Sequence, residues 1–198
     1  MKITRRVLLG SALAATVTPV FGQDSAKVED IVIGNPDASV EVIEYASFTC
    51  PHCRTFHEDT FKQLKADYID TGKIKFVYRE VFFDPYGLWA AMVARCAGPE
   101  KYMDIADRIY AQQSEWQVPS DPGLTADNLK QIGVEAGMDG AAIDRCLGDR
   151  DLSRSLVENY RANAERNGVD STPTLIINGQ KFGNLRYADL VAEIEKAM

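Results

Sequence analysis

The stretch EVIEYASFTCPHC, residues 41–53, constrains the fold of this chain more than any other feature. Residues 39–48 are rich in β-branched and aromatic side chains, and this composition predicts a mostly buried strand. A helix is expected to begin at Cys50, because Pro51 suits the first helical position, where its missing N–H is not needed. The sequence therefore places Cys50 and Cys53 one helical turn apart, where a buried strand gives way to a helix.

The N-terminal segment, residues 1–22, has the features of a cleaved signal peptide. It combines a basic start, a short apolar run and small residues before an expected cut after Gly22. The apolar run is too short for a comfortable membrane span. Arg5 and Arg6 resemble a twin-arginine signal, with the general secretory route as the alternative. We expect export, and an uncut membrane anchor is the competing interpretation.

Length and charge narrow the class of protein. Residues 23–198 suffice for one domain with a substantial core. The full chain has a formal charge of −7, and loss of the basic signal segment would make it more acidic. An acidic surface argues against nucleic acid and anionic lipid as partners.

The four cysteines are expected to form two disulfides, because an exported chain meets an oxidising environment. Four cysteines permit three pairings. Cys50 and Cys53 are close enough in sequence to pair locally, which leaves Cys96 with Cys146. A structural zinc site is disfavoured, because the second pair is widely separated and no histidine lies near it. We therefore expect no metal and a structural disulfide between Cys96 and Cys146.

The remaining strands are expected on either side of a long helical block. Residues 73–83 read as a second strand, parallel to the first because a helix separates them. Residues 172–182 read as two short strands around Asn178-Gly179, a dipeptide that favours a type I′ turn. A last helix is expected over residues 187–198.

The helical block covers residues 87–167, where no segment has a convincing strand pattern. Thr125 and Asp139 are predicted to be N-caps of helices within it. The block is too long for a loop and is expected to be an inserted subdomain. It would separate an N-terminal part, residues 23–86, from a C-terminal part, residues 168–198.

With these features the chain resembles the DsbA-type periplasmic thiol-disulfide oxidoreductases. The segments EYASFTCPHC and STPTLIING, together with the helical block between them, carry the resemblance across nearly the whole mature chain. It implies an α/β thioredoxin-like fold with an inserted all-helical subdomain.

The chemistry of the CPHC segment suggests distinct roles for its residues. The thiol of Cys50 would lie at a helix N-terminus, where unpaired N–H groups and the helix dipole favour a thiolate. Pro51 opens that helix, and His52 would add a positive or hydrogen-bonding group. Cys50 is therefore expected to be the attacked sulfur, and Cys53 the more buried one.

Three further residues are assigned to the site. Glu44 is an ionisable residue in a predicted buried strand, and the resemblance implies that it moves the proton of the deeper thiol. The alternative is that Glu44 points to a solvated face. The resemblance also implies that Pro173 is cis and faces the disulfide, beside backbone that pairs with substrate. Thr172 departs from the valine that dedicated oxidases of the enterobacterial type tend to have at this position, whereas isomerase-type relatives often have threonine.

These assignments predict a monomeric oxidoreductase that donates the Cys50–Cys53 disulfide to exported proteins in the periplasm. Its partners would be reduced exported proteins or unfolded peptides, the resemblance alone implies a DsbB-like membrane oxidase as a further partner, and no cofactor is expected. An envelope isomerase or reductase is one alternative, suggested by Thr172. A binding or chaperone-like module without catalysis is another.

Other chemically suggestive side chains are expected to be structural. His57 follows Cys50 by about two helical turns and is interpreted as a solvated helix residue. Four aromatic residues at loosely helical spacing are expected in the core rather than in a ligand site: Trp89, Tyr102, Tyr110 and Trp116.

Overall fold

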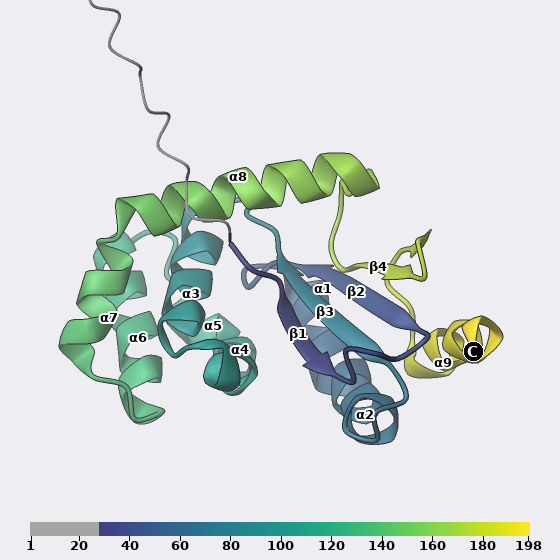
Figure 1. Cartoon of the computed structure of the whole chain (residues 1–198). Coiled ribbons are helices and arrows are strands. Elements are labelled where there is room, and N and C mark those ends of the chain that lie inside the picture. The colour runs from purple at the N-terminus through teal and green to yellow at the C-terminus, as the bar shows by residue number, and fades with distance from the viewer. Residues whose placement is uncertain (1–27) are drawn as a thin grey trace, which may run out of the picture.

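The computed structural model describes residues 28–198, which form a mixed sheet with helices on both faces (Figure 1). The signal peptide expected at residues 1–22 lies outside the described residues. The sheet has five strands in the order β1-β3-β2-β4-β5. Their bounds are β1 Ile31–Gly34, β2 Glu41–Ala46, β3 Lys75–Glu80, β4 Thr174–Ile177 and β5 Gln180–Phe182.

Strand β2 lies at the centre of the sheet. It pairs in parallel with β3 and antiparallel with β4, so that Glu44 has Tyr78 on one side and Leu175 on the other. Strand β1 pairs antiparallel with β3 and is an edge strand that the sequence pattern did not predict. It is only four residues long, and Val32 within it is 43% exposed, so its hydrophobic signal is weak.

The helix after β2 is continuous from Pro51 to Ile69. It comprises α1 (Pro51–Thr55), the π-helical segment η1 (Phe56–Phe61), α2 (Lys62–Leu64) and the π-helical segment η2 (Lys65–Ile69). An aromatic and aliphatic stripe of this helix is buried against the sheet: Phe56, Phe61, Leu64 and Tyr68.

A helical block follows β3 and precedes β4 in the chain. It contains α3 (Pro85–Cys96), η3 (Pro99–Lys101), α4 (Tyr102–Ala111), α5 (Gln113–Trp116), α6 (Pro122–Glu135), α7 (Gly140–Leu147) and α8 (Arg150–Asn167). Helices α3 to α7 gather beside the sheet, and α8 runs back along it (Figure 1). The final helix, α9 (Tyr187–Ala197), packs against β4 and α2.

Both faces of the sheet are buried. One face carries Val42 and Phe76 and joins α1, α9 and the helical block in a single core. The other face carries Ile43 and Tyr45 and is covered by α8, through residues such as Tyr160. Because both faces are covered, β2 reads as a nearly continuous apolar run rather than an alternating one.

Aspartates begin most of the helices in the block, through side chains that accept hydrogen bonds from first-turn N–H groups. Asp139 is the N-cap of α7, as expected, and its Oδ1 accepts from the Ala142 N–H at 2.8 Å. The expectation for Thr125 is wrong, because Asp121 is the N-cap of α6. Thr125 lies buried inside that helix, and its hydroxyl bonds to the backbone of Val118.

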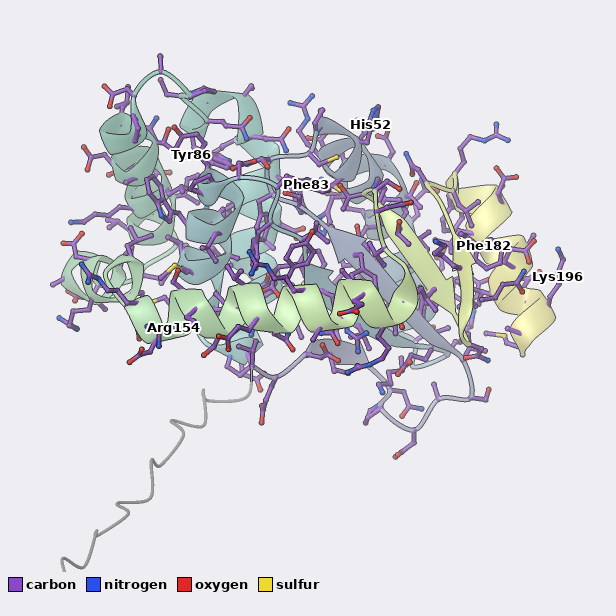
Figure 2. All side chains as sticks on the ribbon, turned by 90° about the horizontal axis from the view of Figure 1, so that it is seen from above. His52, Phe83, Tyr86, Arg154, Phe182 and Lys196 are labelled. Carbon is purple, nitrogen blue, oxygen red and sulfur yellow. A yellow bond between two sulfur atoms is a disulfide. The ribbon has the colours of Figure 1, made fainter. Side chains whose placement is uncertain are left out.

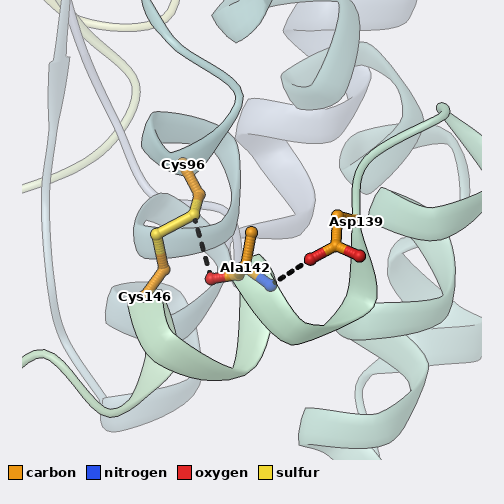
Figure 3. The surroundings of a disulfide bond; sticks show 4 residues. All are labelled: Cys96, Asp139, Ala142 and Cys146. Atoms are coloured by element: carbon orange, nitrogen blue, oxygen red, sulfur yellow. Dashed lines mark hydrogen bonds between the residues drawn. A yellow bond between two sulfur atoms is a disulfide. The ribbon is translucent and has the colours of Figure 1, made fainter.

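A disulfide joins Cys96, at the end of α3, to Cys146, near the end of α7 (Figure 3). Their Cα atoms lie 6.1 Å apart, and 50 residues separate them in sequence. Both cysteines are half-buried, and Cys96 Sγ lies 3.6 Å from the carbonyl oxygen of Ala142. The cross-link therefore ties the first helix of the block to a later one.

The turn between β4 and β5 has the conformation expected from its sequence. Asn178 and Gly179 both have positive φ, at 44° and 87°. The side chain of Asn178 also accepts a hydrogen bond from the N–H of Glu41, which connects the hairpin to β2. Within residues 28–198, no helix has the length and apolar character that crossing a membrane requires.

Candidate active site at the start of helix α1

The CPHC segment lies where β2 gives way to α1, as the sequence predicted. Cys50 is the N-cap residue of α1, with extended backbone angles, and Pro51 occupies the first helical position. Cys50 and Cys53 are free thiols in this structure, so it represents the reduced protein. Cys50 is partly exposed, whereas Cys53 is fully buried beneath it.

The pKa of Cys50 is lowered from 9.0 to about 5. The largest cause is a hydrogen bond that the Cys53 thiol donates to the Cys50 sulfur, and partial burial opposes it. The side chain of Thr172 and the backbone N–H groups of Cys53 and His52 lower the pKa further. Cys50 is consequently a thiolate at neutral pH.

The pKa of Cys53 moves in the opposite direction. Burial raises it strongly, and the Cys50 sulfur and the nearby charge of Glu44 raise it further. Cys53 therefore keeps its proton at neutral pH in the reduced protein. One thiol is reactive and accessible, while the other is protonated and buried.

Glu44 lies fully buried in β2, on the sheet face that α1 covers. The alternative of a solvated face is therefore excluded. Burial and the Cys50 thiolate raise the pKa of Glu44 from 4.5 to about 8. Among the described residues, neither of its carboxyl oxygens has a hydrogen-bond partner. Glu44 thus holds a proton at neutral pH beside the protonated thiol of Cys53.

The segment before β4 forms the third part of the site. The Thr172–Pro173 peptide bond is cis. The carbonyl oxygen of Thr172 lies 3.5 Å from Cys50 Sγ and accepts a hydrogen bond from that thiol when it is protonated. The fold thus brings Thr172 and Pro173 next to Cys50, although more than a hundred residues separate them in the sequence. The substrate-binding roles of Thr172 and Pro173 stay predictions.

The two histidines near the site differ in exposure. The side chain of His52 is exposed at the top of α1 (Figure 2), and it is the backbone N–H of His52 that acts on Cys50. A role for the His52 ring stays a prediction.

His57 is buried, so the expectation of a solvated residue is wrong. Its spacing to Phe61 places it on the apolar stripe of the helix, a signal that its polar side chain obscured. Its ring stacks on Phe61 at 4.3 Å and lies 4.5 Å from that of Tyr110, and Nδ1 lies 3.0 Å from Asp107 Oδ1. Burial lowers the pKa of His57 below 6.5.

The aromatic residues expected in the core are buried, apart from the half-buried Trp89. Two of the polar contacts near the site were missed by sequence reasoning. Tyr78 and Tyr110 share a buried hydroxyl–hydroxyl hydrogen bond of 2.7 Å beside Glu44. Gln113, from α5, bonds to the backbone just before α1. No local sequence pattern predicts these contacts, because they join segments that are far apart in the sequence.

The thioredoxin family profile, described as "Thioredoxin", matches residues 26–196. A Rickettsia bellii protein, whose name describes a protein-disulfide oxidoreductase, is 34% identical over 85% of this chain. This chain spans 64% of that relative's length. Disulfide bond formation protein D of Bacillus subtilis is 28% identical over 90% of this chain and 81% of its own.

Solved structures give the same result for the fold. The crystal structure of Wolbachia pipientis alpha-DsbA1 superposes with a TM-score of 0.78 at 27% identity, covering 85% of this chain and 90% of that one. Oxidised BdbD from Bacillus subtilis gives a TM-score of 0.73 at 26% identity, covering 85% and 92%. These likenesses confirm the predicted α/β thioredoxin-like fold with a helical insertion.

Proposed function

The chain belongs to the thioredoxin family, in its branch of DsbA-type thiol-disulfide oxidoreductases, and from that premise we propose that it is an oxidase. It donates the Cys50–Cys53 disulfide to exported proteins as they fold. The observation that carries this proposal is the position of Cys50, a partly exposed thiol at the start of α1, where the surrounding hydrogen bonds lower its pKa.

The lowered pKa favours the oxidase direction. A thiolate that is stable at neutral pH is a good leaving group, so a disulfide containing it is readily transferred. The same stabilisation applies only to the reduced protein, because Cys50 carries no charge while it is bonded to Cys53. The reduced form is therefore favoured, and the oxidised form tends to take electrons from substrate thiols.

The reaction proceeds in two exchanges. A substrate thiolate attacks Cys50 Sγ, the Cys50–Cys53 bond breaks, and Cys53 leaves with the electron pair. A second substrate thiolate then attacks the substrate sulfur of the mixed disulfide, and Cys50 leaves as a thiolate. The substrate loses two electrons and gains a disulfide, and the protein ends as the dithiol seen in this structure.

Glu44 supplies the proton for the first exchange. Cys53 leaves as a thiolate in a buried position, where an unpaired charge is costly. Burial, the larger cause of the raised pKa of Glu44, acts in both redox forms, so its carboxyl group holds a proton close to Cys53 and is suited to donate it. The proton passes from Glu44 to Cys53 as the sulfur–sulfur bond breaks, and Glu44 then regains a proton from water.

The proposed substrates are reduced exported proteins and unfolded peptides, bound as an extended strand beside Thr172 and Pro173. The Thr172 carbonyl, 3.5 Å from Cys50 Sγ, supports this location. We assign the protein to the periplasm as a monomer, with residues 1–22 as its signal. A DsbB-like membrane oxidase would restore the disulfide.

An isomerase or reductase is the second candidate, favoured by Thr172 in place of valine. The redox state of the protein in cells separates the two directions. Rapid acid quenching and alkylation should find the oxidase mostly oxidised, and mostly reduced after loss of its membrane partner. A protein found mostly reduced in unperturbed cells would contradict the oxidase proposal. A state that is indifferent to that partner would favour a binding module.

A further inference from the structure

The short loop between β2 and α1 determines where the Cys50 sulfur lies. Its turn is closed by a hydrogen bond of 3.1 Å from the Cys50 N–H to the carbonyl of Ser47. The Cys50 carbonyl accepts the first helical hydrogen bond, from the Arg54 N–H at 3.2 Å. These local hydrogen bonds define the conformation of the loop. They do not fix its position relative to the rest of the protein.

Gln113 reaches this loop from the helical block. Its Nε2 donates to the carbonyl of Phe48 at 2.7 Å and to that of Cys50 at 3.0 Å. The side-chain amide has two N–H groups, and both are used on the two carbonyls that flank Thr49. Gln113 is 4% exposed, so water does not compete effectively for these bonds.

The backbone that carries Gln113 is itself well anchored. Gln113 is the first residue of α5, and Trp116 at the other end of α5 is buried. The indole N–H of Trp116 donates to the carbonyl of Ile109 in α4 at 2.8 Å. The amide of Gln113 is thus presented to the loop by a packed part of the helical block.

The Cys50 sulfur needs such a hold, because the groups next to it come from separate places. The N–H groups of His52 and Cys53 belong to α1, whereas Thr172, whose carbonyl oxygen lies 3.5 Å from the sulfur, belongs to the segment before β4. Hydrogen bonds weaken steeply when their geometry degrades. A loop free to move against the helical block would lose alignment with some of these partners.

We propose that Gln113 is a positioning residue for Cys50, whose amide holds the backbone of Phe48 and Cys50 so that the sulfur stays aligned with its hydrogen-bond partners. The helical block is then part of the thiol site as well as a cover for the sheet. This inference rests on the proposed function only in taking Cys50 as the reactive sulfur.

A second attachment ties the loop to the start of α3 independently of Gln113. The Thr49 hydroxyl donates to Asp84 Oδ2 at 2.6 Å, and the hydroxyls of Ser47 and Thr49 lie 3.1 Å apart. Asp84 is the N-cap of α3 and also accepts from the Gly87 N–H at 2.9 Å. Loss of the Gln113 amide is therefore expected to loosen the loop without unfolding the protein.

The test compares three variants by titrating the Cys50 thiolate in the reduced, full-length protein. Gln113→Met keeps the size of the side chain and removes both donors. Gln113→Asn keeps the amide but withdraws it by one methylene group. Gln131→Met makes the same chemical change at an exposed glutamine of α6 and is the matched control. Thiolate absorbance and the alkylation rate are followed against pH, with thermal unfolding in parallel.

We expect Gln113→Met to raise the titration midpoint of Cys50 by about one pH unit and to slow alkylation about tenfold below that midpoint. Gln113→Asn should shift the midpoint in the same direction by less, and Gln131→Met should leave it unchanged. A lowered melting temperature with an unchanged midpoint would mean that Gln113 is only structural and would overturn the proposal.

If Gln113→Met does not fold, the Asn variant decides: a raised midpoint supports the proposal and an unchanged one refutes it. The titration needs no substrate. A wild-type protein that fails to oxidise substrates would therefore refute the oxidase function without touching this inference.

Discussion

The two thiols of the CPHC segment differ in burial, and this difference decides which of them reacts. Cys50 is partly exposed and has a pKa of about 5, whereas burial keeps Cys53 protonated. The hydrogen bond between them acts on both, because a donor that stabilises one thiolate becomes harder to deprotonate itself. The asymmetry is thus a property of the pair.

The first prediction concerns these two sulfurs. Cys50→Ser should abolish oxidation of a reduced, unfolded protein, because the attacked sulfur is gone. Cys53→Ser should instead accumulate mixed disulfides through Cys50, visible on non-reducing gels. In the reduced wild-type protein, iodoacetamide at mildly acidic pH, just above the Cys50 pKa of about 5, should label Cys50 first. Faster labelling of Cys53 would reverse the assignment.

The second prediction concerns Glu44. Its pKa is raised from 4.5 unfolded to about 8 folded, so the folded protein binds the proton more tightly. Its contribution to stability is full below pH 4.5 and is lost as the pH rises through about 8. Glu44→Gln should therefore gain stability relative to wild type as pH rises across this window, with a limiting slope of about 1.4 kcal/mol per pH unit.

Urea unfolding of both reduced proteins at pH 5 and pH 8 measures the difference in their free energies of unfolding. Glu41→Gln is a suitable control, because Glu41 lies in the same strand but is half-exposed. If the free energies of unfolding of Glu44→Gln and wild type differ by the same amount at both pH values, the pKa of Glu44 is not raised by folding. The same variant should also slow the first exchange, in which Cys53 needs a proton.

At the scale of elements, the strand-to-helix junction could be predicted from sequence because its signals are local. Pro51 after Cys50 and the turn at Asn178-Gly179 act through their own backbone preferences. Glu44 stood out as an ionisable residue among apolar ones. The contacts of Gln113 and of the Tyr78–Tyr110 pair could not be predicted, because they depend on how the helical block packs against the sheet.

The missed elements have physical reasons of their own. Strand β1 is short and lies at the sheet edge, with Val32 exposed, so it lacks the long apolar run of β2. Threonine is a common N-cap residue, but the helix begins earlier than Thr125. Asp121 lies directly before Pro122, and proline favours the first helical position. The side chain of His57 is polar, but the residue lies on the buried apolar stripe of the helix after β2.

The third prediction concerns the disulfide between α3 and α7. It closes a separation of 50 residues, and the double variant Cys96→Ala, Cys146→Ala should lose roughly 4 kcal/mol of stability on the chain-entropy estimate. Neither cysteine begins a helix, so neither has the setting that activates Cys50. Gentle reduction of the oxidised protein should give two free thiols, and denaturing reduction four.

The double variant should leave the alkylation rate of Cys50 unchanged, since its sulfur has none of its stabilising partners in α3 or α7. Release of all four thiols together under gentle conditions would mean that the Cys96–Cys146 pair is a second redox-active couple. Unchanged thermal stability in the double variant would remove its structural role.

At the scale of the whole molecule, redox state and folding stability are linked through Cys50. The folded, reduced protein has a Cys50 pKa of about 5, against 9.0 for an ordinary thiol, and the oxidised protein has no Cys50 thiol to titrate. A lowered pKa contributes stability that is full above pH 9 and is lost as the pH falls through about 5. This contribution belongs to the reduced form alone.

The last prediction is that the stability of the reduced protein, relative to the oxidised one, increases between pH 5 and pH 8. The chain constraint of the Cys50–Cys53 bond adds a constant to this difference and leaves its pH dependence unaffected. Glu44 partly opposes the trend, because the thiolate raises its pKa, so the rise should be steeper in the Glu44→Gln background. Urea unfolding of both redox forms at several pH values measures it. A difference that stays flat or falls with pH would mean that Cys50 has an ordinary pKa, and the thermodynamic basis for an oxidase would be lost.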